Sequence, residues 1–156
     1  MSLTPVQRRL KQKNKNIQLL VVEGYRTPEY QELYYLQELC LQSRLNPKLD
    51  FAQIVENVHR FVALPSVAGH PTGGAVDVSL AINGCEVAMG GKIADFAIPE
   101  LLPTFSALVT SEQGAWRLLL HDAMISEGFA PFYGEWWHFS FGDREWAAYY
   151  RLSESF

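Results

Sequence analysis

The order of strand-like and helix-like segments is the feature that most constrains the fold of this chain. A continuous aliphatic run at residues 17–25 is of strand length and predicts a buried strand. Two helical patterns follow before the next strand-like segment at residues 75–80, and a helix at residues 111–127 precedes a last strand at residues 135–141. Because strands and helices do not alternate as regular βαβ units, we predict an α+β fold: a small antiparallel or mixed sheet with flanking helices.

The helix that follows the first strand has a clear start and one apolar face. Thr27 can act as its N-cap, and Pro28 fits the first helical position. Leu33, Leu36 and Cys40 then fall on one side. This is the spacing of an amphipathic helix that packs its apolar stripe on a core.

Other residues mark the remaining helix boundaries. Asp50, with Gln53 three residues later, predicts a capping box for the second helix, which ends before Pro65. Gly128 is placed to close the helix at residues 111–127 at its C′ position. Asp143 is expected to cap a short final helix.

Length and hydropathy favour one domain over residues 1–156 without a membrane span. A chain of 156 residues is of ordinary single-domain size, and no apolar run reaches the roughly 18 residues of a transmembrane helix. The first twenty residues lack the apolar stretch and cleavage site of a signal peptide. We therefore expect a cytoplasmic protein, or an envelope protein if the N-terminus has been trimmed.

The charge pattern argues against nucleic acid as a partner. The formal net charge is −4, and no aromatic residues for base stacking are interleaved with the basic residues near the start. Cys40 and Cys85 show no CxxC spacing and are expected to be small apolar fillers, with a lone disulfide as the alternative. His59 and His121 lie in helical patterns and are expected to make surface or local hydrogen bonds.

The strand-like segment at residues 75–80 carries a carboxylate on one face. Val76, Val78 and Leu80 alternate with more polar or smaller residues, so they share one side of the strand. Asp77 then points away from the aliphatic side. The sequence thus places an acidic side chain on a strand that is otherwise suited to a core.

The last strand-like segment, EWWHFSF, separates a glutamate from a histidine by two tryptophans. Strand alternation puts Trp137 on the face of the two phenylalanines that follow, and Trp136 on the face of His138. Trp137 is therefore expected in the core, with Trp136 flanking the histidine. Residues three apart on a regular strand face opposite sides, so Glu135 and His138 converge only if the chain twists at Gly134 or Glu135.

Two short segments each combine a histidine with a carboxylate. GHPTGGAVD contains His70 and Asp77, and GEWWH contains Glu135 and His138. Two imidazoles and one carboxylate make a zinc site with an open fourth position, and the remaining glutamate is free to move a proton between a water of pKa about 7 and a leaving amine. A packed, hydrogen-bonded core histidine is the alternative interpretation of each segment.

These segments resemble the motifs of one enzyme family. HPTGGAVD at residues 70–77 matches the H-x-x-G-x-A-x-D element, and EWWH at residues 135–138 the E-x-W-H element, of the zinc D-alanyl-D-alanine dipeptidase and D,D-carboxypeptidase family, which includes the vancomycin-resistance dipeptidases. EGYRTPEYQ at residues 23–31 is similar to the family's upstream G-Y-R segment. The resemblance covers nearly the whole chain, and the motifs occur in the family's order.

The resemblance implies a site for one Zn²⁺ per chain, in a cleft over the sheet. His70, Asp77 and His138 would be its ligands. Glu135 would be the general acid and base, and Arg26 would stabilise the oxyanion of the tetrahedral intermediate.

The sequence also departs from the family pattern. The family usually has a serine two residues before the first zinc histidine, where it helps to hold the substrate's carboxylate, but here Ala68 occupies that position, with Ser66 nearby. The segment before the conserved arginine is shorter than in the family's dipeptidases, because only 25 residues precede Arg26. AMGGKIADF resembles the stretch whose aspartate binds the substrate's free amino group, which makes Asp95 the candidate and an exposed loop carboxylate the alternative.

The expected activity is zinc-dependent hydrolysis of D-alanyl-D-alanine or a similar small dipeptide. One alternative is a D,D- or L,D-carboxypeptidase that acts on peptidoglycan stem peptides. Another is a non-catalytic module that binds cell-wall peptides. The expected partner in every case is a small D-amino-acid dipeptide or a peptide derived from peptidoglycan.

Overall fold

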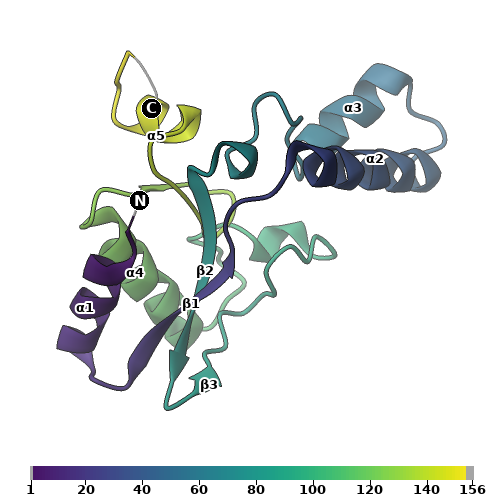
Figure 1. Ribbon diagram of the computed structural model, residues 1–156. Coiled ribbons are helices and arrows are strands. Elements are labelled where there is room, and N and C mark those ends of the chain that lie inside the picture. The colour runs from purple at the N-terminus through teal and green to yellow at the C-terminus, as the bar shows by residue number, and fades with distance from the viewer. Residues whose placement is uncertain (1, 154–156) are drawn as a thin grey trace.

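One antiparallel sheet organises the computed structural model, which describes residues 2–153 (Figure 1). Its strands run in the order β1-β2-β5-β4, and β3 pairs with the far end of β2. The strands are β1 (Ile17–Glu23), β2 (Ala75–Ile82), β3 (Cys85–Glu86), β4 (Ala130–Pro131) and β5 (His138–Ser140). Every pairing is antiparallel, which confirms the predicted α+β fold.

The helices of residues 2–153 are α1 (Thr4–Lys13), α2 (Pro28–Leu45), α3 (Phe51–His59), α4 (Ser111–Ile125) and α5 (Arg144–Tyr149), with short 3₁₀ turns at His70–Thr72 and Pro99–Leu101. Of these, α2, α3 and α5 begin at the capping residues that the sequence predicts. The Thr27 hydroxyl caps α2, Asp50 and Gln53 form the expected capping box of α3, and Asp143 accepts the Trp146 N–H at the start of α5. Gly128 follows α4 at φ +84°, the left-handed conformation that ends helices. No helix within residues 2–153 combines the length and apolarity needed to cross a bilayer.

Helix α1 was not expected, since its residues were treated only as a basic cluster. Pro5 lies in the first turn, and Val6 and Leu10 are both fully buried. Their i, i+4 spacing is enough to dock one side of a short helix. The lysines and arginines lie on the remaining surface.

The main core fills the space between the sheet, α1 and α4. Val76, Val78 and Leu80 of β2 all point into it, with exposed fractions of 0 to 1%. Leu10 of α1 and Leu120 of α4 join the same cluster. The alternation expected for β2 is therefore confirmed, and its other face is left for Asp77.

Strand β1 lies at the edge of the sheet, and the prediction that it is buried is wrong. It pairs only with β2, and just Ile17 is buried in it. Val21 and Val22 are 57% and 53% exposed. An aliphatic run indicates strand propensity, but it does not reveal how many neighbours the strand acquires.

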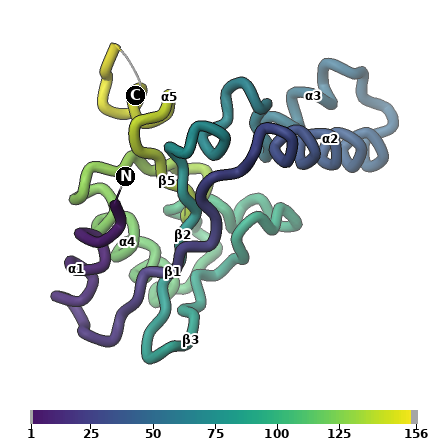
Figure 2. Tube along the Cα trace, viewed as in Figure 1, coloured from purple at the N-terminus to yellow at the C-terminus, as the bar shows by residue number. Residues whose placement is uncertain are grey.

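Helices α2 and α3 pack against each other and extend away from the sheet, on the opposite side from α1 and α4 (Figure 1). The chain leaves the sheet after β1, forms this helical hairpin and returns to β2 (Figure 2). Leu33, Leu36 and Cys40, the face expected on the core, are all exposed, whereas the buried residues of α2 are Gln31 and Glu38.

Both cysteines are likewise exposed and free, so neither is the buried filler that was predicted. Cys85 belongs to the two-residue strand β3. It follows Asn83 and Gly84, which form a tight turn with φ of 53° and 80°. Cys40 belongs to the outward side of α2, for which the sheet offers no partner.

Candidate metal centre and cleft

Asp77 lies at the centre of the sheet and is 4% exposed. Strand β2 pairs it with His138 on β5 and with Glu23 on β1. Because its neighbours Val76 and Val78 point into the core, the carboxylate projects from the opposite face. A rigid, fully paired strand therefore holds this side chain.

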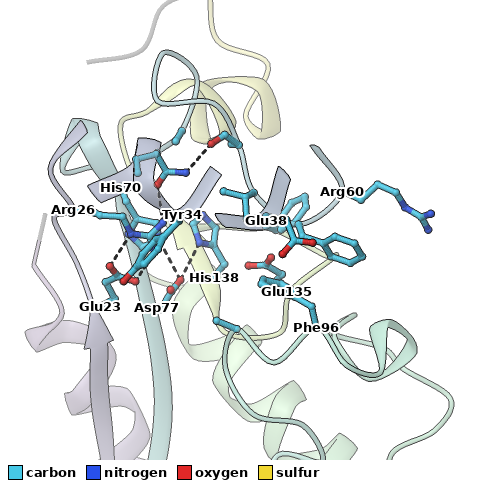
Figure 3. Close-up of a pocket in the computed structure, with 18 of the residues that line it drawn as sticks. Glu23, Arg26, Tyr34, Glu38, Arg60, His70, Asp77, Phe96, Glu135 and His138 are labelled. Carbon is cyan, nitrogen blue, oxygen red and sulfur yellow. Dashed lines mark hydrogen bonds and ion pairs between the residues drawn. The ribbon is translucent and has the colours of Figure 1, made fainter. Parts of the chain in front are cut away.

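Three predicted ligands converge on that face. The Oδ1 atom of Asp77 lies 2.9 Å from Nδ1 of His138 and 3.4 Å from Nε2 of His70. One potential ligand atom from each residue lies within 4.8 Å of the other two. Residues far apart in sequence thus meet with the nitrogen and oxygen donors that suit zinc, as Figure 3 shows.

The proton on His70 is fixed by a carbonyl group. Nδ1 of His70 lies 2.7 Å from the backbone oxygen of Gly24, which can only accept, so Nδ1 carries the hydrogen. Nε2 of His70 then turns its lone pair toward the carboxylate of Asp77. Two electron-rich atoms that face each other repel unless a cation lies between them. The arrangement of His70 and Asp77 therefore fits a bound metal ion.

The loop that carries His70 depends on its glycines. Gly73 has φ +74°, a conformation that other residues rarely adopt. A Cβ atom on Gly74 would lie 2.8 Å from Cβ of Asp143, and one on Gly69 would lie 2.5 Å from its carboxylate. The glycines of the motif therefore allow the loop to pack closely against the start of α5.

The electrostatics of the three ligands favour a negative centre. Burial raises the pKa of Asp77, but the hydrogen bond with His138 and the interactions with both imidazoles outweigh it and lower the pKa to about 2. Burial lowers the pKa of His138, yet the hydrogen bond and charge of Asp77 raise it overall. Asp77 is consequently ionised at neutral pH.

Glu135 lies in a turn before β5. This turn explains how Glu135 and His138, three residues apart, can face the same side. The predicted strand at residues 135–141 begins only at His138 and ends at Ser140. The backbone N–H of Glu135 donates to the carbonyl of Phe132, and the N–H of His138 donates to the carbonyl of Glu135. Because these residues are not on a regular strand, Glu135 and His138 line the same cleft.

The environment of Glu135 suits proton transfer. Burial is the main cause that raises its pKa to about 7, and the charges of Asp77 and Glu145 add to the effect, while His138 and His70 oppose it. A carboxyl group with a pKa near neutrality can both accept and release a proton under physiological conditions.

The two tryptophans differ in part from their predicted places. Both are buried, and their rings meet edge to face at 5.4 Å. Trp137 belongs to the core as predicted, but it also lines the cleft. Trp136 packs on Arg117 at 5.4 Å and is not a lining residue, so the prediction that it flanks His138 is wrong. Strand alternation does not extend back into the turn.

The cleft lies between the sheet and the α2–α3 hairpin and has a volume of about 670 Å³. The metal-site residues and Glu135 form one side, which we call the sheet wall (Figure 3). The other side, the helical wall, consists of cleft-lining residues of α2 and of the segment after α3. Arg26, just before the N-cap of α2, lines the cleft between the two walls.

The guanidinium of Arg26 is held from several sides. It forms a two-point ion pair with Glu23, donates to Oε1 of Gln31 at 2.7 Å and lies 4.8 Å from the ring centre of Tyr34. Burial lowers the pKa of Arg26, but the hydrogen bond and charge of Glu23 raise it overall. Arg26 is thus a fixed cation within the cleft, as its predicted role requires.

Two residues of the sequence pattern are not in the cleft. Asp95 is exposed, does not line the cleft, and accepts the backbone N–H of Ala97 at 3.2 Å. This matches the alternative interpretation, an exposed loop carboxylate. In this position Asp95 is not placed to bind the amino group of a substrate in the cleft. Ser66 is exposed as well, and Ala68 presents only a methyl group to the cleft.

Three cleft carboxylates escaped the sequence prediction: Glu23, which pairs with Arg26, and also Glu38 and Glu145. Glu145, on α5, lies 3.7 Å from Nε2 of His138. Glu38 lies on the inward side of α2. One feature of the sequence could have indicated that Glu38 faces inward. Glu38 lies seven residues, or about two helical turns, after Gln31, so both polar side chains are on the same side of α2, opposite the apolar face.

Comparisons with known proteins agree with this architecture. The family model described as D-ala-D-ala dipeptidase, of peptidase family M15, matches residues 6–154. A D-alanyl-D-alanine dipeptidase of Synechocystis sp. is 30% identical, in an alignment that covers 85% of this chain and 63% of the relative. The aligned part thus spans less than two thirds of that relative's length.

A solved structure supports the fold. VanYB in complex with D-alanine-D-alanine aligns over 95% of this chain and 76% of that chain, with a TM-score of 0.50 and 18% sequence identity. At this level of identity the likeness concerns the fold. It is consistent with an α+β domain built on an antiparallel sheet.

Proposed function

This chain belongs to the D-alanyl-D-alanine dipeptidase family of peptidases, and we propose that it hydrolyses D-alanyl-D-alanine or a similar small dipeptide with the help of one zinc ion. The observation that carries this proposal is the convergence of His70, Asp77 and His138 within 4.8 Å, in one cleft with Glu135. This combination supplies a metal site and a group that transfers protons.

His70, Asp77 and His138 would hold the zinc ion. When bound, zinc supplies a Lewis acid for the peptide carbonyl and lowers the pKa of a water molecule to about 7. The hydrogen bond from His70 to the Gly24 carbonyl orients this imidazole and sets its tautomer. The chain therefore contributes ligands that are aligned in advance.

Glu135 would move the proton. In its ionised form it accepts a proton from the attacking water, and in its neutral form it delivers that proton to the leaving amine. A pKa of about 7 supports both steps near neutral pH. Trp137, which lines the cleft from the core, limits the access of bulk water to this group.

Arg26 would stabilise the negative charge that develops on the carbonyl oxygen. Its ion pair with Glu23 and its bond to Gln31 fix the guanidinium, so little reorganisation is needed during the reaction. These bonds occupy only part of its donors, since a guanidinium carries five N–H groups.

The size of the cleft favours a second candidate. A volume of about 670 Å³ is within the range of pockets that hold molecules larger than a dipeptide. A D,D- or L,D-carboxypeptidase that acts on peptidoglycan stem peptides would use the same zinc site. A module that only binds cell-wall peptides is the non-catalytic alternative.

The test combines zinc content with the release of free D-alanine. For the wild type we expect one zinc per chain and release from D-alanyl-D-alanine. For Glu135→Gln we expect the same zinc content and a loss of roughly 10²- to 10⁴-fold in kcat, because general acid and base catalysis contributes on that scale. The exposed Glu86→Gln on β3 serves as the matched control.

Each outcome selects one candidate. Cleavage of tri- or pentapeptides with the dipeptide left intact indicates the carboxypeptidase. Zinc binding without cleavage of any D-amino-acid peptide indicates the binding module. Wild-type turnover by Glu135→Gln would refute the assigned role of this residue.

A further inference from the structure

Asp143, the N-cap of α5, is a buried carboxylate that the proposed chemistry does not use. Its exposed fraction is 4%, and its Oδ1 atom accepts the backbone N–H of Trp146 at 2.9 Å. Its Oδ2 atom is also buried and has no hydrogen-bond partner among residues 2–153. Within the same residues Asp143 forms no ion pair. One oxygen of the group thus caps the helix, while the other oxygen has no partner.

Capping of a helix does not by itself explain this carboxylate. The hydroxyl groups of Thr27 and Thr110 cap α2 and α4 in the same way, by accepting a backbone N–H. Asp50 caps α3 with a carboxylate, but Asp50 is exposed, so its charge remains hydrated. Removing a carboxylate from water costs free energy unless a cation or several hydrogen bonds replace the lost hydration. The buried carboxylate of Asp143 therefore indicates a second role.

The unpartnered oxygen of Asp143 lies against the loop that carries His70. A Cβ atom on Gly69, the residue before His70, would lie 2.5 Å from this oxygen, so a side chain at position 69 would displace it. A Cβ atom on Gly74 would lie 2.8 Å from Cβ of Asp143. Asp143 thus packs against both ends of the loop, next to one proposed metal ligand and three residues before another, Asp77.

The proposed metal centre is a source of the positive charge that Asp143 lacks. A zinc ion held by two neutral imidazoles and one carboxylate keeps a net positive charge. A buried anion near this charge is stabilised by it. Because coupling between two binding events is reciprocal, the anion strengthens metal binding by the same free energy.

We propose that Asp143 strengthens zinc binding by His70, Asp77 and His138 without being a ligand itself. Its carboxylate holds the His70 loop and supplies negative charge close to the metal site. This inference rests on the proposed function, because it takes zinc as the bound cation. Asp143 does not line the cleft, so its role is to position the loop and balance charge, not to act on the substrate.

Neutralisation of Asp143 should affect metal binding and stability in opposite directions. Asp143→Asn keeps the shape and the capping oxygen but removes the charge. Zinc affinity should fall about 10- to 100-fold, the usual range for groups that support metal ligands. The zinc-free variant should have the same melting temperature as the zinc-free wild type or a higher one, because an unpaired buried charge has been removed. A residue that only supports the fold would lower the melting temperature.

The experiment measures zinc affinity by competition with a chromogenic chelator, and thermal unfolding of the zinc-free proteins, for wild type, Asp143→Asn and Asp143→Ser. Serine also caps helices but is too short to hold the loop, so we expect at least the same loss of affinity. The matched control is Asp50→Asn, which neutralises the exposed cap of α3 and should change zinc affinity by less than about threefold, because an exposed charge is screened.

Two results would overturn the role of Asp143. One is unchanged zinc affinity in either Asp143 variant. The other is a melting temperature of zinc-free Asp143→Asn more than about 3 °C below that of the wild type, since the loss of affinity would then reflect a weakened fold.

Zinc affinity is measured without turnover, which separates this inference from the proposed activity. If the wild type binds zinc but releases no D-alanine, the proposed hydrolysis fails, and the difference between wild type and Asp143→Asn still decides the role of Asp143. If the wild type hydrolyses the dipeptide and Asp143→Asn binds zinc equally well, the proposed function holds and the role of Asp143 is overturned. A wild type without zinc affinity would overturn both.

Discussion

The two walls of the cleft are built in opposite ways. Behind the sheet wall lies apolar packing, since Val76 and Val78 beside Asp77 are at most 1% exposed. Behind the helical wall there is solvent, because Leu33 and Leu36 are 44% and 52% exposed while Glu38 faces inward. The residues of the proposed metal chemistry therefore lie on the packed wall, whereas the other wall consists of helices with an exposed outer face.

The helical wall is connected to the rest of the molecule by the packing of Phe61 against the main core and by polar contacts of Gln31. The side chain of Gln31, 2% exposed, donates to the carbonyl of Ala63 and accepts from Arg26. No residue of α2 or α3, all of which are described, belongs to the main core cluster. Regions with few buried apolar contacts open at lower free energy than core strands, so the helical wall is the more adaptable side.

Removal of Trp137 is the most severe test of the packed wall. Trp137 is 1% exposed, and Trp137→Ala should lower the free energy of unfolding by about 3 to 5 kcal/mol. Chemical denaturation monitored by far-UV circular dichroism measures this value. A loss below about 1 kcal/mol would mean that the sheet wall is not tightly packed, and the contrast between the two walls would be wrong.

Truncation of Glu145 tests how the packed wall holds the proposed metal ligands. Its carboxylate lies 3.7 Å from Nε2 of His138, while Nδ1 of the same ring faces Asp77. Partners of a ligand's second nitrogen typically change metal affinity by about 10- to 100-fold, and we expect Glu145→Ala to weaken zinc binding on that scale.

Competition with a chromogenic chelator measures that zinc affinity. Glu86→Ala is the control for loss of an exposed carboxylate, and thermal unfolding of the zinc-free proteins shows whether the fold is intact. Unchanged affinity in a folded Glu145→Ala variant would show that Glu145 does not help to orient His138.

The smallest effect is expected on the outer face of the helical wall. Leu36 is 52% exposed, and Leu36→Ala should change the free energy of unfolding by less than about 0.5 kcal/mol. The same denaturation assay gives the value, with Trp137→Ala as the opposite extreme. A loss of 2 kcal/mol or more would indicate that another surface covers this face in solution.

Local sequence rules predicted the packed wall and the starts of α2, α3 and α5, but not which face of the helical wall is buried. The alternation around Asp77 and the capping residues Thr27, Asp50 and Asp143 follow from short-range geometry, and the structure has them as predicted. The convergence of His70, Asp77 and His138 was predicted from two motifs and a family resemblance. Strand pairing between β2 and β5 brings Asp77 and His138 together, and the turn before β2 adds His70.

The errors share one physical origin. The face of α2 with Leu33, Leu36 and Cys40 and the exposed side of β1 have apolar patterns that predict burial, but burial depends on whether another element reaches them. Glu38 escaped notice for the converse reason. A polar residue inside a helical pattern reads as solvated until the tertiary structure shows that it faces a cleft.

The hydrogen bonds around His70 close a neck at the base of the helical hairpin. His70 Nδ1 donates to Gly24, and the N–H of Arg26 donates back to the His70 carbonyl at 3.3 Å. The two ends of the segment that connects β1 to β2 are thus hydrogen-bonded to each other as well as joined to the sheet. Residues 27–68 are therefore attached to the sheet at a point where His70 already takes part, so we expect a change in the length of this hairpin to alter the cleft while the strands keep Asp77 and His138 in place.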